Sequence, residues 1–405
     1  MTGSALRQAL AWAAMALGGV LAAAPVQTLA QTQAQAVTVG VVSLDGDPRY
    51  APRRVERAYP GHPVSRAVEG VKLAAADSAY ELGTLGLQMQ VSEQRVREAK
   101  DLPAALAQMK AQRVRYLVSD LPAPLLQALV AQAPAALGDV VVFNTSSDDD
   151  TLRAQACARH LLHTYPSRAM LSDALAQYLA AQRWTQALVL NGSSNADAAW
   201  RAAFERSAKR FGVKLVAQRD FALSGDPRQR DLGNVRLLTS DRQHDVVVVL
   251  DADGEFARTV PYATNQPRPV VGASGLSPLA WHPQWERYGA PQLTRRFGRQ
   301  TRASMVGQDW AAWMAGRAIA TALVQRPKGS AAEHLAALRG GDITLDGFKG
   351  RVLSFRAWDG QLRQPVFLSH GDGVVGLAPM DGVLHPTDVL DTLGVDEKES
   401  PCKSR

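Results

Sequence analysis

The segment VVVFNTSSDDD, residues 140–150, is the starting point for interpreting this chain. Its first four residues are apolar and mostly β-branched, and the seven that follow are all polar. An apolar run of this length with an abrupt polar end is typical of a buried strand in a parallel sheet. We therefore expect the polar residues to lie where the strand opens to solvent, which makes them a candidate ligand-binding edge.

The same pattern recurs along the chain, and helical patterns separate its copies. The other apolar runs, each followed by small or acidic residues, are 37–44, 115–118, 187–190, 245–250 and 270–271. Strands that alternate with helices in this way predict an α/β fold with mostly parallel sheets. In such sheets ligands bind beyond the carboxyl ends of the strands. The sequence therefore predicts a binding cleft before it predicts any chemistry.

A chain of 405 residues is long enough for two lobes, each with its own core. We expect each lobe to be a mostly parallel sheet flanked by helices, with the cleft between the lobes. The predicted boundaries are 37–165 and 268–340 for lobe 1, 166–267 and 341–385 for lobe 2, and 386–405 for a disordered tail.

The amino-terminal residues predict export. Arg7 is followed by an uncharged apolar stretch and then by small and polar residues, which is the order found in a secretory signal peptide. We place the signal at residues 1–30, with cleavage after Ala30 or, as a second choice, after Ala36. The apolar stretch is too short for the alternative, a membrane-spanning anchor, which needs about 20 residues. We expect a periplasmic protein without stable membrane insertion.

The cysteines and the charge balance exclude some kinds of site. The only two cysteines, Cys157 and Cys402, lack the spacing of a structural zinc site. Because Cys402 lies in the charged sequence VDEKESPCKSR, we expect two free thiols, with a disulfide as the alternative. The net charge of +7 is mild for this length, and the arginines lack the interleaved aromatic residues of a nucleic-acid surface.

These features together resemble the type I periplasmic solute-binding proteins of ABC importers. The resemblance rests on the signal, the VTVGVVSL strand, the AVEGVKLAAADSA helix, the QDWAAWMAGRAIATAL helix and the closing DGFKGRVLSFRAWDGQL. The most similar group binds branched-chain amino acids and amides, and within it a subgroup accompanies PQQ-dependent alcohol oxidation. The resemblance implies a monomer that takes a small solute, closes about a hinge and delivers the solute to a membrane permease.

The resemblance also implies where the ligand binds. Members of this group hold an amino acid with hydroxyl residues of the first lobe and with an acidic and an aromatic residue of the second. The first-lobe positions correspond to Ser119, Asn144, Thr145 and Ser146, and the acidic strand ends add Asp120. The second-lobe positions correspond to Ser194, Asn195, Asp251, Asp253 and Ser274. Matching tyrosines are missing, and Ser274 stands where an acidic residue is expected, so the resemblance does not identify the ligand as a branched-chain amino acid.

Other functions remain as alternatives. If several acidic strand ends met in the cleft, they could bind a hard metal ion, although Asp is also the usual turn and cap residue at strand ends. A ligand sensor that signals to a membrane partner is a second alternative. His160 and His163 lie three residues apart, but without a third ligand nearby we interpret them as structural. No nucleophile, zinc-protease or nucleotide-binding motif is found, so we expect neither an enzyme nor a cofactor.

Overall fold

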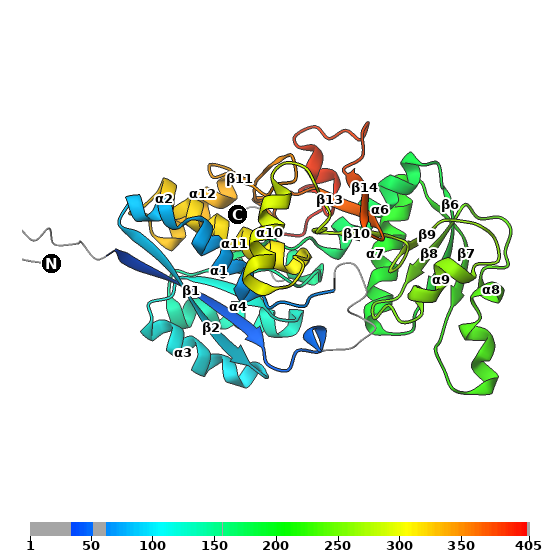
Figure 1. The fold of residues 1–405 in the computed structure, drawn as a ribbon, viewed down its shortest axis with the longest axis horizontal. Helices are drawn as coiled ribbons and strands as arrows, with labels where there is room; N and C mark the ends of the chain where they lie inside the picture. The colour runs from blue at the N-terminus through cyan, green and yellow to red at the C-terminus, as the bar shows by residue number, and fades with distance from the viewer. Residues whose placement is uncertain (1–33, 52–61, 156, 403–405) are drawn as a thin grey trace, which may run out of the picture. The chain divides into compact units, whose positions relative to one another are not determined.

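The computed structural model describes residues 34–51, 62–155 and 157–402. It contains two helix-flanked β-sheets, which we call lobe 1 and lobe 2, and this confirms the predicted α/β class (Figure 1). Within the described ranges, no helix combines the length and apolar character that crossing a bilayer requires. The predicted signal peptide, residues 1–30, lies outside those ranges.

Lobe 1 is built on a parallel sheet with the order β2-β1-β3-β4-β5. Its strands are β1 (Gln35–Leu44), β2 (Leu87–Val96), β3 (Tyr116–Asp120), β4 (Val141–Asn144) and β5 (Leu161–His163). Its helices are α1 (Ala67–Asp77), α2 (Ala79–Thr84), α3 (Leu102–Ala111), α4 (Ala123–Leu137), α5 (Thr151–Ala154), α10 (Ala290–Thr301), α11 (Gly307–Gln325) and α12 (Ala331–Gly340). The VVVF run that predicted a buried strand forms β4.

Alternating side chains of these strands enter two different cores. Val141 and Phe143 pack on the side of α1 and α11, whereas Val142 packs on the side of α3 and α4. Because successive side chains of a strand point to opposite faces, a continuous apolar run is required when both faces are covered. The uninterrupted apolar pattern therefore explains why the sheet lies between two helical layers.

Lobe 2 contains a mixed sheet with the order β14-β13-β10-β9-β8-β6-β7. Its strands are β6 (Gln186–Asn191), β7 (Lys214–Asp220), β8 (Val246–Leu250), β9 (Val270–Gly272), β10 (Leu276–Leu279), β13 (Val366–His370) and β14 (Gly373–Ala378). Helices α6 (Arg168–Ala181) and α7 (Asn195–Phe211) share one core with this sheet, and α8 (Val235–Leu238) and α9 (Val260–Ala263) share the other. The strands from β10 to β14 pair antiparallel, and the rest pair parallel.

Two of the predicted boundaries between the lobes are wrong. Residues 268–279 were assigned to lobe 1, but β9 and β10 lie in the sheet of lobe 2, where Leu276 is part of the core. Residues 341–365 were assigned to lobe 2, but β11 (Leu345–Asp346) and β12 (Val352–Leu353) contribute Leu345 and Leu353 to the core of lobe 1. The chain therefore crosses between the lobes near residues 163–168, 279–290 and 353–366.

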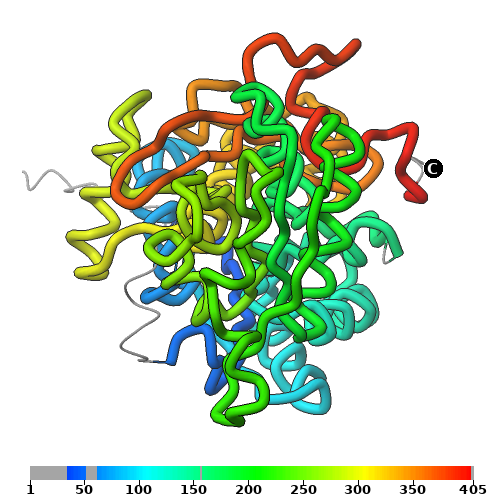
Figure 2. The backbone as a smooth tube through the Cα atoms, turned by 90° about the vertical axis from the view of Figure 1, so that its right-hand side faces the viewer, coloured from blue at the N-terminus to red at the C-terminus, as the bar shows by residue number. Residues whose placement is uncertain are grey.

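The prediction of a disordered tail at 386–405 is also wrong for residues up to 402. The chain forms a short 3-10 helix at Val389–Thr392, and Leu390 and Leu393 are buried. The red C-terminal segment runs past the green helices of lobe 2 (Figure 2). Two leucines and a buried ion pair of Asp391 order this segment, although its composition is otherwise polar.

The expectation of two free thiols is wrong as well. Cys157 and Cys402 form a disulfide, with their Cα atoms 5.4 Å apart. The two residues are 245 positions apart in sequence, and the folding of the tail back onto lobe 1 brings them together. No local pattern could indicate that contact.

Candidate functional site

A cavity of about 750 Å³ is lined by residues of both lobes. Lobe 1 and the first crossing contribute Arg49, Asp148, Tyr165 and Gln308. Lobe 2 contributes the carboxyl ends of β8 and β9, the antiparallel strands β10 and β13, and residues of α6 and α7. The cavity therefore lies at the predicted place, beyond the carboxyl ends of parallel strands.

Three predicted residues of lobe 2 line this cavity: Asp251, Asp253 and Ser274. One carboxylate oxygen of Asp251 accepts a 2.8 Å hydrogen bond from the backbone N–H of Ala257. Burial, and then the nearby carboxylates, raise the pKa of Asp251 to about 6. Among the described residues, neither Asp251 nor Asp253 has a basic partner within 4.0 Å. The lobe 2 wall of the cavity therefore carries two carboxylates that form no ion pair with a described residue, and it also includes Arg258.

Ser194 and Asn195 do not line the cavity. Ser194 is the N-cap of α7, where its hydroxyl accepts from the backbone N–H of Asp197 at 3.1 Å and donates to the Asp197 carboxylate at 2.7 Å. Asn195 is the first residue of the same helix. Such a reciprocal cap satisfies free N–H groups at the start of a helix, so these residues organise α7.

The predicted residues of lobe 1 lie at the ends of β3 and β4 but are covered by protein. Asn144 donates to the carbonyl of Ser147 at 2.7 Å, and its amide nitrogen is 3.1 Å from Nδ1 of His163. The Thr145 hydroxyl donates to the carbonyl of Ser119 at 3.0 Å. The buried hydroxyls of Ser119 and Ser146 have no partner within the described chain. These residues do not line the cavity in this conformation.

The side chains of Arg49 and Tyr50 cover this edge of lobe 1. Asp120 is fully buried and accepts from Arg49 at 2.8 Å and from the Tyr50 hydroxyl at 2.6 Å. Arg49 also donates to Asp47, which caps its own turn. Although burial opposes the charge, the carboxylates of Asp120 and Asp47 raise the pKa of Arg49. The chain therefore supplies its own cation to the acidic end of β3.

The acidic run Asp148–Asp150 connects the lobes. Asp148 pairs with Arg168 at 2.9 Å, and Asp150 accepts from the backbone N–H of Ala169 at 3.1 Å. Asp149, which precedes the N-cap residue Asp150 of α5, accepts from the N–H of Thr151 at 2.9 Å. No group of three or more His, Cys, Asp or Glu suited to a metal ion occurs in the part of the chain that the structure describes. An ion pair and hydrogen bonds from backbone N–H groups therefore account for this run.

The two histidines that were interpreted as structural have structural contacts. Nε2 of His160 is 3.0 Å from the carbonyl oxygen of Val130, and His163 is hydrogen bonded to Asn144. Burial lowers the pKa of both imidazoles. Both side chains are therefore best described as neutral groups that complete hydrogen bonding inside lobe 1.

Comparisons with known proteins identify the fold. No protein-family model and no curated protein matches the sequence. A periplasmic ligand-binding protein of a branched-chain amino acid ABC transporter from Burkholderia xenovorans LB400 is similar in structure, with a TM-score of 0.67 and 14% identity. That match covers 90% of this chain and 99% of the other. The fold is that of a type I periplasmic binding protein.

Other structures with this periplasmic binding fold bind different ligands. A leucine-, isoleucine-, valine-, threonine- and alanine-binding protein from Brucella ovis matches with a TM-score of 0.66 and 13% identity, over 86% of this chain and 95% of that one. An R. palustris solute-binding protein in complex with benzoate matches with a TM-score of 0.63 and 15% identity. That match covers 91% of this chain and 99% of the other. The similar structures also include a periplasmic binding protein from Burkholderia mallei and an ABC transporter substrate-binding protein from Desulfitobacterium hafniense in complex with Leu.

Among the cavity residues that the sequence did not indicate are two buried serines. Ser172 of α6 and Ser369 of β13 line the cavity, each 2% exposed, and neither hydroxyl has a partner within the described ranges. Ser369 follows the apolar residues Val366–Leu368 and precedes Gly371 and Asp372, so the pattern of an apolar run with a polar end could have indicated it. Ser172 lies inside a helix, where no sequence signal distinguishes it.

Proposed function

We propose that this chain is the periplasmic substrate-binding component of an ABC-type importer. It captures a small solute in the cavity between its lobes, closes by hinge rotation and delivers the solute to a membrane permease. The observation that carries this proposal is the cavity itself, which both lobes line and which contains buried hydroxyls that have no partner among the described residues. An unsatisfied buried hydroxyl costs about 1–3 kcal/mol, and a polar ligand group can remove that cost.

The proposed ligand contacts lie mainly on lobe 2. Asp251, Asp253 and Ser274 border the cavity, and Ser172 and Ser369 add two hydroxyls to its wall. The predicted residues of lobe 1, Ser119, Asp120 and 144–146, would reach a ligand only if the segment around Arg49 and Tyr50 moved away. We therefore expect the contacts on lobe 2 to dominate the affinity.

The proposal includes export to the periplasm through the signal at residues 1–30, and action as a monomer without a catalytic step. The resemblance to the subgroup found with PQQ-dependent alcohol oxidation adds the quinone, short alcohols and their acids to the solutes to be tested. The branched-chain amino acids and benzoate bound by similar proteins complete the panel.

A thermal-shift experiment on ligand-free protein tests the proposal. The mature chain is unfolded, dialysed and refolded to remove any bound solute, and is then mixed with the panel and with divalent and trivalent metal ions. A solute present at 100 times its dissociation constant stabilises the protein by about 2.7 kcal/mol. We expect at least one organic solute to raise the melting temperature.

Three variants locate the binding site. Asp251→Asn should weaken the shift, whereas Asp220→Asn changes an exposed carboxylate of lobe 2 away from the cavity and should leave the shift unchanged. Ala273→Trp places a large side chain in the cavity wall and should abolish binding. Binding that persists in Ala273→Trp would move the site elsewhere, and a panel without any shift would argue against a solute-binding role.

A further inference from the structure

Residues 388–402, which we call the clasp, contact both lobes. On lobe 2, the backbone N–H of Gly394 donates to the Asp173 carboxylate of α6 at 2.7 Å, and Arg210 of α7 donates to the Gly394 carbonyl at 2.8 Å. The Gln177 amide lies 3.2 Å from the Thr392 hydroxyl. The clasp is therefore attached to the two helices that form one core of lobe 2.

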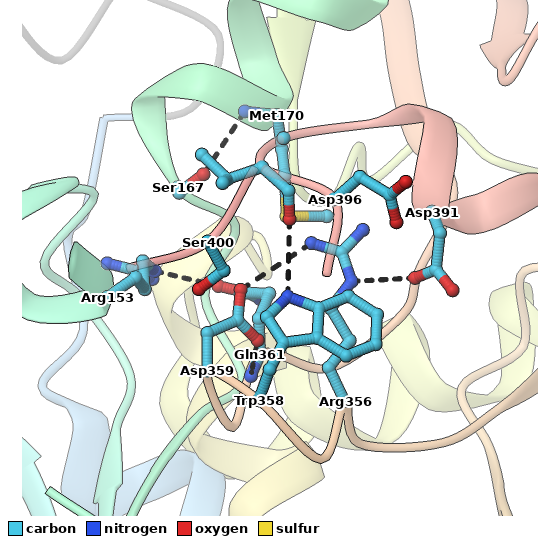
Figure 3. Close-up of polar contacts among 12 residues, drawn as sticks. Arg153, Ser167, Met170, Arg356, Trp358, Asp359, Gln361, Asp391, Asp396 and Ser400 are labelled. Atoms are coloured by element: carbon cyan, nitrogen blue, oxygen red, sulfur yellow. Dashed lines mark hydrogen bonds and ion pairs between the residues drawn. The ribbon is translucent and has the colours of Figure 1, made fainter. Parts of the chain in front are cut away.

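The clasp is also attached to the third crossing, which packs on lobe 1. Arg356 donates to the Asp391 carboxylate at 2.7 Å, and both side chains are 1% exposed (Figure 3). The Trp358 indole donates to the carbonyl of Val395 at 3.3 Å. In the same crossing, Gln361 donates to the carbonyl of His163 in β5. A rotation of the lobes must therefore change the surroundings of a buried ion pair.

The far end of the clasp is bonded covalently to lobe 1. Cys402, which is 3% exposed, forms the disulfide with Cys157 in the segment between α5 and β5. Only seven residues separate Cys402 from Gly394, which is held on lobe 2. The clasp thus spans the two lobes with a hydrogen-bonded end and a covalent end.

We propose that the Cys157–Cys402 disulfide makes the clasp a redox-sensitive restraint on the relative motion of the lobes. Without the disulfide the clasp is tethered only through residue 387 and its free end can move away from lobe 1, whereas a clasp tethered at both ends stays at a high effective concentration and rebinds. The disulfide therefore keeps the contacts of Asp391 and Gly394 populated. This inference concerns the mechanics of the lobes and stands apart from the identity of any solute.

Release of the restraint requires a dithiol reductant. One thiolate of the dithiol attacks a sulfur of the disulfide, the bond between Cys157 and Cys402 breaks, and the second thiolate resolves the mixed disulfide. Two electrons and two protons pass to the cysteines, and the dithiol becomes a disulfide. Cys157 is the exposed partner, so the reductant can approach from its side.

Single-molecule energy transfer between dyes on the two lobes tests the proposal. Keto-bearing amino acids placed at Tyr80 of lobe 1, which is 85% exposed, and at Leu223 of lobe 2, which is 60% exposed, accept dyes without using thiols. We expect one narrow distribution of transfer efficiency in the oxidised chain. Dithiothreitol, or the double variant Cys157→Ser/Cys402→Ser, should broaden it and add a population of lower efficiency.

Two further comparisons separate a restraint from a disulfide that only adds stability. Arg210→Gln loosens the lobe 2 end of the clasp while the disulfide remains, and it should also broaden the distribution. Arg201→Gln on the exposed side of the same helix should not. Dithiothreitol should have no further effect on the double variant. An unchanged, narrow distribution in the reduced chain, with its circular dichroism retained, would overturn the proposal.

Discussion

The side chain of His160 supplies a hydrogen bond that helix α4 cannot make within itself. Pro134 lies within α4 and has no N–H to donate to the carbonyl of Val130, four residues earlier. Nε2 of His160 lies 3.0 Å from the Val130 carbonyl oxygen and donates to it instead. The histidine therefore repairs the hydrogen bond that the proline removes.

We predict that this repair can be measured in a double-mutant cycle. His160→Ala leaves the Val130 carbonyl without a partner and should lower the free energy of unfolding by about 1–3 kcal/mol. In the Pro134→Ala background the helix supplies its own N–H, so the same substitution should cost less. Urea denaturation of the four proteins gives the coupling energy, and equal costs in both backgrounds would contradict this role.

Asp251 should make stability depend on pH in a known direction. Its pKa in the folded chain, about 6, lies above the ordinary value of 3.8, so the charged carboxylate opposes folding. That penalty is complete above about pH 6 and disappears below the unfolded-state pKa. Asp251→Asn should therefore be more stable than the wild type at pH 7.5, and the difference should shrink as the pH falls from 7 to 4. Urea denaturation at several pH values measures this difference in the free energy of unfolding. Asp220→Asn, at an exposed carboxylate, is the control. A difference for Asp251→Asn that does not change with pH would show that the pKa of Asp251 is not raised in the folded chain.

Two glycines test how closely the helices of lobe 1 pack. A methyl group at Gly70 of α1 would lie 2.5 Å from the carbonyl oxygen of Asp309 in α11, whereas one at Gly83 of α2 would meet nothing within 4 Å. Gly70→Ala should destabilise the fold by about 1–3 kcal/mol, because backbone atoms cannot yield. Gly83→Ala should stabilise it by about 0.5–1 kcal/mol, because alanine is the better helix former. Thermal unfolding measures both effects, and a neutral Gly70→Ala would show that the helices can separate.

Strands were predictable from the sequence where a continuous apolar run marks them. The apolar runs at 140–143 and 245–250 correspond to β4 and β8, because a strand covered on both faces requires such a run. Strand β10 was assigned to lobe 1 incorrectly, because a short antiparallel strand carries no signal for its partner, whereas β13 lies within the residues 341–385 that were assigned to lobe 2. Sequence pattern therefore indicated the parallel strands better than the connections between the lobes.

The candidate site was predictable only in part, for a similar reason. Asp251 and Ser274 directly follow strands, so position in sequence gives their place at the edge. Asp120 is the last residue of a strand, but Arg49 lies 71 residues earlier and covers it. The partner of a buried charge is a long-range contact, and a single sequence does not specify it.

At the scale of the whole molecule, the disulfide should contribute to stability. A bond between residues 245 positions apart restricts the unfolded chain strongly, and removal of such bonds typically costs about 2–5 kcal/mol. We expect dithiothreitol to lower the urea midpoint of the wild type and to leave Cys157→Ser/Cys402→Ser unchanged. Equal midpoints for the oxidised and reduced wild type would show that the unfolded state gains little freedom.

The repeated crossing of the chain between lobes has a consequence for biogenesis. During synthesis, lobe 1 lacks α11 until residue 325 has been made, and the sheet of lobe 2 lacks its antiparallel edge until residue 378. The disulfide of Cys157 can form only after Cys402 has been synthesised. Neither lobe can therefore reach its final packing early, so most of the polypeptide must leave the ribosome before native structure becomes available to it. A chain that folds this late stays open long enough to be threaded through a translocation channel.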